Sequence, residues 1–389
     1  MLSNADIDIM ATEEFRQSVL RNIERDPVVV ALDKHVENAS LVATQVKYLQ
    51  RAKHKLPRLY EAGCIIPPRA FEQSSSEESA GVKAICGSSL LDLTCGLGID
   101  TMSFSERFDR VVALERDEVL ARVVRYNLGL LGIKNVEVVT TSAEVYLSQC
   151  NEHFDWIFVD PDRRSAEGKK MVRMEDCSPN VLEQMPNIER IANRLGVKLS
   201  PLFDVEEARR LFPRSEVEVV SIGGECKELN VYTKASQERL RIVIAGVGVW
   251  EYDFEAIVAH PTVAPFVIER AKYLIVPDVA MQKGRVAVAE FSHYAQIWSN
   301  NGYAFAESLP EGKIPAKIYA IERVERYNPK QLKKELKGAG VEILKRDTQL
   351  SIDAVRKATG MRAGSEHMMA ITAIGSDNWA VYIKRNDEN

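Results

Sequence analysis

Two kinds of apolar pattern alternate along the middle of the chain. Short apolar runs such as "SLLDLT", "RVVALE" and "DWIFVDPD" are typical of buried strands, and sequence of helical periodicity such as "DEVLARVVRYNLGLLG" lies between them. Strands that alternate with helices favour right-handed crossover connections and a parallel sheet with helices on both faces. The pattern extends from about residue 82 to about residue 222, so it predicts an α/β domain.

The alternating pattern occupies less than half of the 389 residues, which implies further domains. We expect an N-terminal helical region over residues 1–75, the α/β domain over 76–250 and a C-terminal α+β region over 251–389. The last part of this C-terminal region mixes strand and helix patterns in the manner of a small, ferredoxin-like domain.

The composition is that of an ordinary globular protein, with 46% hydrophobic and 28% charged residues. No segment approaches the roughly 18 consecutive apolar residues of a membrane span, and we expect a cytoplasmic protein without a membrane partner. The six cysteines contain no C-x-x-C pair, so no metal site is expected. The net charge of -5 gives no overall positive field for nucleic acid, although Pro310 to Asn389 hold fifteen Lys and Arg against eleven Asp and Glu.

The first strand of the α/β domain ends in a glycine turn, "LLDLTCGLGID". Asp92 ends the strand, and Gly96 and Gly98 follow with one residue between them. At the carboxyl end of a parallel strand, such a turn presents bare backbone to a ligand, where a Cβ atom would collide or forbid the turn. A G-x-G pair serves dinucleotides as well as adenosyl cofactors. Thr101 stands where a dinucleotide turn has its third glycine, which argues against a nicotinamide or flavin site.

Candidate ligand contacts follow at the ends of the next two strands. Glu115 ends the second strand, where a carboxylate can accept hydrogen bonds from both hydroxyls of a ribose. Ser142 and Ala143 follow the third strand, where an adenine ring would lie. A solvated Glu at a strand end is the alternative for Glu115 alone, but its place in one βαβ unit with the glycine turn favours an adenosine-containing ligand.

The fourth strand ends in "IFVDPDRR", which carries a second set of polar residues. Asp160 can accept a hydrogen bond from a substrate amine or from a cofactor ammonium. Pro161 would fix the direction of the chain, while Arg163 and Arg164 could bind a phosphate or a carboxylate. The alternative is a loop with an internal ion pair between an Asp and an Arg.

These blocks together resemble the class I S-adenosylmethionine-dependent methyltransferases. The closer resemblance is to the bacterial family of such methyltransferases that carries a C-terminal THUMP-like domain, because "FEQSSSEESAGVKA" and "GGECKEL" are also similar to segments of that family. The resemblance implies a Rossmann-like sheet over residues 76–250, S-adenosylmethionine as the cofactor, and a THUMP-like domain over 314–389.

The resemblance also implies roles for particular residues. The connector before the first strand would fold over the cofactor, the glycine turn would contact its methionine part, and Asp160 with Pro161 would form the edge where the methyl group is transferred. The candidate cofactor-binding residues are Gln73, Ser75, Ser76, Asp92, Gly96, Gly98, Glu115, Ser142, Ala143 and Asp160. The candidate catalytic residues are Asp160, Pro161 and Arg163.

One departure bears on the chemistry. Methyltransferases that act on amino groups carry Asp-Pro-Pro-Tyr, whereas Asp162 stands here at the second proline and Arg163 at the aromatic residue. Without an aromatic ring there to stack on a base, methylation of adenine N6 or a similar amine is in doubt.

Three functions are compatible with these features. The favoured one is methyl transfer from S-adenosylmethionine to RNA, with Asp160 positioning or deprotonating the acceptor. The second is a non-catalytic module of methyltransferase-like fold that binds RNA or a protein through Arg163, Arg164 and the C-terminal domain. The third is a nicotinamide-dependent oxidoreductase, which predicts NAD at Glu115 and is disfavoured by Thr101.

Overall fold

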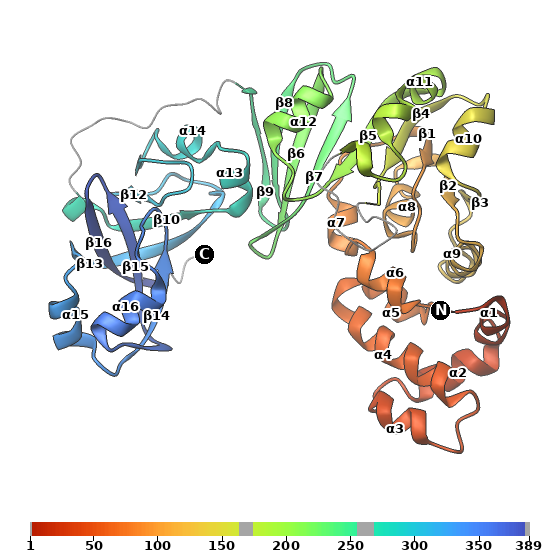
Figure 1. Ribbon diagram of the computed structural model, residues 1–389, viewed down its shortest axis with the longest axis horizontal. Coiled ribbons are helices and arrows are strands. Elements are labelled where there is room, and N and C mark those ends of the chain that lie inside the picture. Colours follow the sequence, from red (N-terminus) through yellow and green to blue (C-terminus); the bar gives the residue numbers. More distant parts are fainter. Residues whose placement is uncertain (1, 163–173, 255–267, 386–389) are drawn as a thin grey trace. The chain divides into compact units, whose positions relative to one another are not determined.

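The computed structural model describes residues 2–162, 174–254 and 268–385 (Figure 1). The chain divides into two compact units, one of Met1–Val217 with Lys227–Gln237 and one of Glu218–Cys226 with Glu238–Asn389. Over the described ranges, no helix has the length and apolar character that crossing a bilayer requires.

Seven helices open the first unit, in agreement with the helical N-terminal region expected from the sequence. They are α1 (Asn4–Met10), α2 (Glu13–Arg21), α3 (Pro27–Leu32), α4 (Ala39–Lys55), α5 (Pro57–Ala62), α6 (Pro68–Gln73) and α7 (Glu77–Gly81). Capping side chains explain several of their starts, since Ser3 forms a capping box at α1 and Asp26 caps α3 directly before Pro27. The Pro- and Ser-rich connector contains α6 and α7, two short helices that its composition does not predict.

The α/β region forms a nine-stranded sheet with the order β3-β2-β1-β4-β5-β7-β6-β8-β9. Its strands are β1 (Gly87–Asp92), β2 (Phe108–Glu115), β3 (Val136–Thr140), β4 (Phe154–Val159), β5 (Ala192–Leu199), β6 (Ser215–Ile222), β7 (Glu225–Thr233), β8 (Arg239–Ile244) and β9 (Gly248–Tyr252). Neighbours from β3 to β5 are parallel, whereas β5 pairs with β7 in antiparallel fashion. The order reverses between β1 and β4, which is where open α/β sheets bind their ligands.

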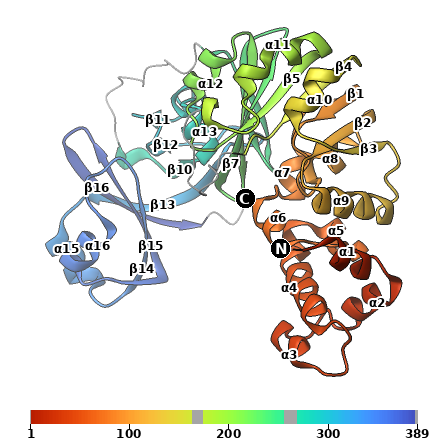
Figure 2. The same cartoon turned by 45° about the vertical axis from the view of Figure 1, so that its right-hand side comes forward.

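The described helices that accompany this sheet are α8 (Ile99–Phe104), α9 (Glu118–Leu130), α10 (Ala143–Gln149), the 3-10 helix η1 (Met174–Asp176), α11 (Val181–Ile191) and α12 (Val205–Leu211). The N-terminal helices share a hydrophobic core with α8 and α9, and Figure 2 shows them gathered beside α9. The buried amide of Asn127 on α9 accepts a hydrogen bond from the N–H of Ile65 and donates one to its carbonyl, both at 2.9 Å. The helical region is therefore an integral part of the first unit.

A seven-stranded sheet with the order β11-β12-β10-β13-β16-β15-β14 forms most of the second unit. Besides β8 and β9 of the nine-stranded sheet, the described elements of this unit are η3 (Ile268–Arg270), β10 (Tyr273–Pro277), α13 (Val279–Lys283), α14 (Ala287–Phe291), β11 (Gln296–Ile297), β12 (Ala304–Ala306), β13 (Ala316–Arg326), α15 (Pro329–Leu336), β14 (Gly340–Lys345), α16 (Ile352–Thr359), β15 (Arg362–Ile374) and β16 (Asp377–Arg385). The small α+β domain expected from the sequence is confirmed. Its order β-α-β-α-β-β differs, however, from the β-α-β-β-α-β order of a ferredoxin-like domain.

Candidate active site

The glycine turn joins β1 to α8 and requires glycine at two positions. Gly96 and Gly98 have φ angles of 55° and 83°, in the left-handed region that side chains disfavour. A Cβ atom at Gly98 would lie 3.1 Å from Cγ1 of Val124, whereas one at Gly96 would have no other described atom within 4 Å. The backbone at Gly96 thus borders open space next to the ends of β1 and β2.

Asp92 is buried beneath this turn with a relative exposure of 1%. One carboxylate oxygen accepts a hydrogen bond from the N–H of Thr94 at 2.9 Å, and the other accepts one from the hydroxyl of Thr101 at 2.5 Å. Burial raises the pKa of Asp92 to about 7, and the carboxylates of Asp100 and Asp160 contribute in the same direction. Asp92 therefore changes its charge near neutral pH, and a bound cation would favour the ionised form.

Glu115 lies at the end of β2 and is fixed to the same turn. Its carboxylate accepts hydrogen bonds from the N–H groups of Gly96 at 3.0 Å and Asp117 at 2.8 Å. Burial raises the pKa of this carboxyl group. Each oxygen retains capacity for a second hydrogen bond, so the pair can still receive two ribose hydroxyls.

Ser142 and Ala143 lie at the start of α10, after β3. The hydroxyl of Ser142 caps this helix by accepting a hydrogen bond from the N–H of Val145 at 3.3 Å, and Ala143 is buried. The N–H of Thr141 donates to the carbonyl of Glu115 at 3.1 Å, which places this segment beside the end of β2.

Asp160 follows β4 and lies close to the glycine turn. Its N–H donates to the hydroxyl of Thr94 at 2.7 Å, and its side chain is 31% exposed. Pro161 is buried directly after it. Arg163 and Arg164 lie outside the described residues.

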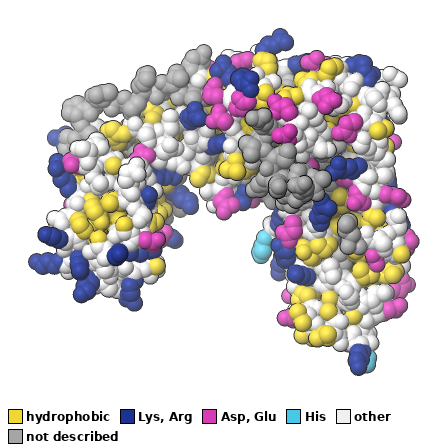
Figure 3. All heavy atoms as spheres, in the orientation of Figure 1, with side chains coloured by type: hydrophobic (Ala, Val, Ile, Leu, Met, Phe, Trp, Pro, Cys, Tyr) yellow, Lys and Arg dark blue, Asp and Glu magenta, His cyan; other side chains and the backbone are white. Residues whose placement is uncertain are grey.

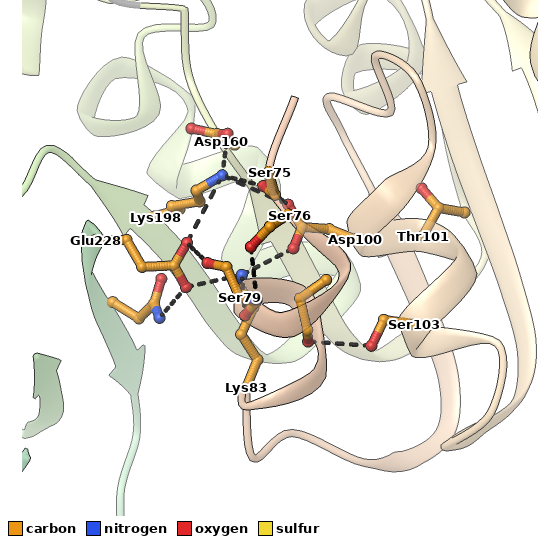
Figure 4. Close-up of polar contacts among 12 residues, drawn as sticks. Ser75, Ser76, Ser79, Lys83, Asp100, Thr101, Ser103, Asp160, Lys198 and Glu228 are labelled. Carbon is orange, nitrogen blue, oxygen red and sulfur yellow. Dashed lines mark hydrogen bonds and ion pairs between the residues drawn. The ribbon is translucent and has the colours of Figure 1, made fainter. Parts of the chain in front are cut away.

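A charged network that the sequence analysis did not find lies beside Asp160 (Figure 4). The ammonium group of Lys198, on β5, is 2.7 Å from Oδ2 of Asp160 and 3.5 Å from Oδ2 of Asp100. Lys83, which is fully buried, lies 2.8 Å from both Asp100 and Glu228. We refer to these five residues as the charged network.

Two connector serines join this network, and two other connector residues do not. Ser75 donates to Asp100 at 2.9 Å and accepts from Lys198 at 2.7 Å, while Ser79 donates to Glu228 at 2.8 Å. Ser76 instead caps α7, and Gln73 is exposed at the end of α6.

These residues fit a cationic adenosyl cofactor better than a dinucleotide. S-adenosylmethionine carries positive charge on its sulfonium and ammonium groups, which the carboxylates of Asp92, Asp160 and Glu115 would attract. The pyrophosphate of a dinucleotide would instead lie against the buried carboxyl of Asp92. The open backbone at Gly96 and the fixed carboxylate of Glu115 match the two contacts that an adenosyl group needs.

Two family models match the chain. Residues 74–175 match the family described as Conserved hypothetical protein 95, and residues 316–385 match the family described as THUMP domain-like. The first range includes the connector from Ser74 onward, the glycine turn and the end of β4, and the second runs from the start of β13 to the end of β16.

Several known proteins are similar to this chain. An uncharacterized S-adenosylmethionine-dependent methyltransferase of Mycobacterium tuberculosis is 23% identical over 342 residues, which cover 84% of this chain and 90% of the relative. A tRNA/tmRNA (uracil-C(5))-methyltransferase of Neisseria meningitidis is 28% identical over 172 residues, which cover 38% of this chain and 47% of the relative.

A solved structure shares the fold. The crystal structure of a "putative methyltransferase" from Porphyromonas gingivalis W83 matches the full length of both chains with a TM-score of 0.82 and 22% identity. The resemblance noted in the sequence is thus confirmed: over most of its length the chain is similar to an S-adenosylmethionine-dependent methyltransferase, and its C-terminal strands and helices match the THUMP domain-like family.

Proposed function

We propose that this protein transfers a methyl group from S-adenosylmethionine to RNA. The observation that carries the choice of RNA is a row of exposed lysines on the THUMP-like domain. The relatives named as tRNA/tmRNA methyltransferases support the same class of acceptor.

The first unit supplies the groups that the reaction needs. When bound, S-adenosylmethionine provides a sulfonium methyl group, whose carbon bonds to a lone pair of the acceptor while the C–S bond breaks and leaves its electrons on sulfur. Asp92 and Glu115 would fix the methionine and ribose parts. Asp160, at the exposed edge, would orient the acceptor and receive the proton of an N–H or O–H group.

The lysine row lies on α15 and the residue that follows it. Lys330, Lys333, Lys334 and Lys337 are all exposed, and none of the four forms an ion pair with a described residue. Their spacing of three, four and seven places them on the side of the helix away from the buried Leu332 and Leu336. We refer to these four residues as the lysine row.

Further positive charge surrounds the row. Lys357 on α16 and Arg362 on β15 are exposed, and Arg362 donates a hydrogen bond to the carbonyl of Gly338 at 2.7 Å, so the ends of α15 and α16 meet. Figure 3 shows Lys and Arg side chains gathered over this end of the domain. Residues 316–385 contain fourteen Lys and Arg against eight Asp and Glu. A face of this kind attracts phosphate groups.

Replacing the lysine row tests the RNA contact. The probe is unfractionated tRNA, and the variant replaces all four lysines of the row by Gln. This variant should bind more weakly than the wild type, and its slope of log Kd against log salt should be smaller by about 3. Each neutralised phosphate adds about 0.7 to 0.9 to that slope. The fourfold Lys→Arg variant keeps the charge and should retain the slope. Equal slopes in the Lys→Gln variant and the wild type would remove the lysine row from the proposal.

Methyl transfer is tested with labelled S-adenosylmethionine and separate RNA and protein fractions from cells that lack the gene. The proposal expects label in RNA. Label in the protein fraction would contradict the proposal and identify protein as the class of methyl acceptor. Salt-sensitive RNA binding without transfer to either fraction would favour the non-catalytic RNA-binding module instead.

A further inference from the structure

The two lysines of the charged network have different surroundings. Lys83 has no exposure, and its ammonium is satisfied by Asp100, Glu228 and the carbonyl of Ser79 at 2.8, 2.8 and 3.1 Å. These partners are themselves largely buried, so we assign Lys83 a structural role in stabilising the folded protein. Lys198 is 12% exposed, and its ammonium contacts Asp160, which is accessible at the edge of the site.

Lys198 contacts both sides of the candidate active site. Its ammonium is 2.7 Å from Oδ2 of Asp160, at the edge where the acceptor would enter, and 2.7 Å from the hydroxyl of Ser75, in the connector. The hydroxyl of Ser75 in turn donates a hydrogen bond to the carboxylate of Asp100 at 2.9 Å (Figure 4). One ammonium group therefore connects β4, β5, the connector and α8.

We propose that Lys198 is a positioning residue of the methyl-transfer reaction, which holds Asp160 toward the acceptor and Ser75 of the connector over the cofactor. This inference rests on the proposed methyl transfer but not on RNA as the acceptor. Lys198 acts through its two partners and does not itself touch the reacting atoms.

The charge balance supports this role. The network contains three carboxylates, of Asp100, Asp160 and Glu228, and two ammonium groups. Its carboxylates raise the pKa of Lys198 despite the burial of that residue, so the ammonium remains protonated and acts as a hydrogen-bond donor rather than as a base. Without Lys198, the carboxylates of Asp160 and Asp100 would face each other with no cation between them, and Asp160 would turn toward solvent.

The first test measures the connector in the protein without cofactor. Hydrogen exchange of the peptide that spans residues 74–81 should be faster in Lys198→Met, because Ser75 loses its donor. It should be unchanged in Asp160→Asn and restored in Lys198→Arg. Unchanged exchange in Lys198→Met would overturn the connector half of the proposal.

The second test is a double-mutant cycle on methyl transfer, with S-adenosylmethionine affinity measured by calorimetry alongside. Lys198→Met should lower the rate constant of transfer at least about tenfold, as expected for the loss of a hydrogen bond to a charged group, and should lower cofactor affinity less. At saturating S-adenosylmethionine, where a weaker hold of Ser75 on the cofactor does not limit the rate, the double variant Lys198→Met/Asp160→Asn should have the activity of Asp160→Asn alone. The double variant removes one charge of each sign and so leaves the net charge of the network unchanged, which keeps this comparison available if Lys198→Met does not fold.

The acceptors are the RNA and protein fractions from cells that lack the gene. The fraction that takes up label is one result, and the ratio of transfer activity between variants is a second, independent result. Label in protein contradicts the RNA proposal but still gives the ratios for Lys198. At saturating S-adenosylmethionine, a double variant at least about tenfold less active than Asp160→Asn would overturn the proposal, because Lys198 would then act on the transfer step apart from Asp160. Absence of label in both fractions would overturn this inference and the proposed function together.

Discussion

Replacing Asp92 by Asn should stabilise the first unit at alkaline pH while removing its function. Asp92 is an unusual group, because its carboxyl is buried with two hydrogen-bond donors and no cation among the contacts described for it. Burial raises its pKa from 3.8 to about 7. Between these values the folded state binds a proton that the unfolded state has released, so the free energy of unfolding falls as pH rises.

The size of the effect follows from the shift. About three pKa units, at about 1.4 kcal/mol each, correspond to about 4 kcal/mol lost by pH 8. About two of these pKa units lie above pH 5. The free energy of unfolding of Asp92→Asn should therefore rise by about 3 kcal/mol relative to the wild type between pH 5 and pH 8.5. At every pH, the substitution should also lower the free energy of unfolding by about 1 kcal/mol. The amide has only one oxygen, so it cannot replace both carboxylate oxygens that accept hydrogen bonds from Thr94 and Thr101.

Hydrogen exchange in the peptide of residues 87–92 measures this effect in the first unit alone, after correction for the intrinsic pH dependence of exchange. Asp109→Asn, an exposed carboxylate on β2, is the control. If the difference between Asp92→Asn and the wild type were the same at pH 5 and pH 8.5, the reasoning from burial would be refuted. The variant should also bind S-adenosylmethionine far more weakly than the wild type.

Three further changes give expected outcomes. Affinity for S-adenosylmethionine, measured by calorimetry, should fall about tenfold for each pH unit below about 7, since Asp92 must release its proton to meet a cation. Glu115→Gln should weaken the same affinity by about tenfold or more through the loss of charged acceptors, and unchanged affinity would argue against ribose binding there. Lys83→Met should lower the free energy of unfolding by about 3–5 kcal/mol, read by denaturant unfolding, because two buried carboxylates lose the nearer of the two cations beside them and Lys198 remains farther away.

The sequence predicts the cofactor side of the site because its residues are close along the chain. The strand ending in Asp92, the glycine turn and the strand ending in Glu115 form one βαβ unit, so a parallel pairing suffices to bring them together. The observed register pairs Asp92 with Ala113, two residues before Glu115. Local pattern and topology therefore determine this half of the site without knowledge of side-chain packing.

The charged network could not be predicted in the same way. Lys83 and Glu228 are separated by more than 140 residues, and their contact depends on β7 lying antiparallel to β5. A signal existed, because Lys198 and Glu228 are charged residues that adjoin runs of buried residues in their strands. Such residues are rarely buried unless they are paired, so two of opposite charge indicate a pair but not its partners.

Thr101 shows how one substitution distinguishes two cofactor turns that share a G-x-G pair. In a dinucleotide fold, the third glycine allows the helix to pack closely against the strand. Thr101 is fully buried here, and its hydroxyl joins α8 to the end of β1 through Asp92. The hydrogen bond favours the ionised form of a carboxyl that burial would otherwise keep protonated, and so prepares it for a cation. We therefore expect a turn of this kind to favour a positively charged adenosyl cofactor over a dinucleotide.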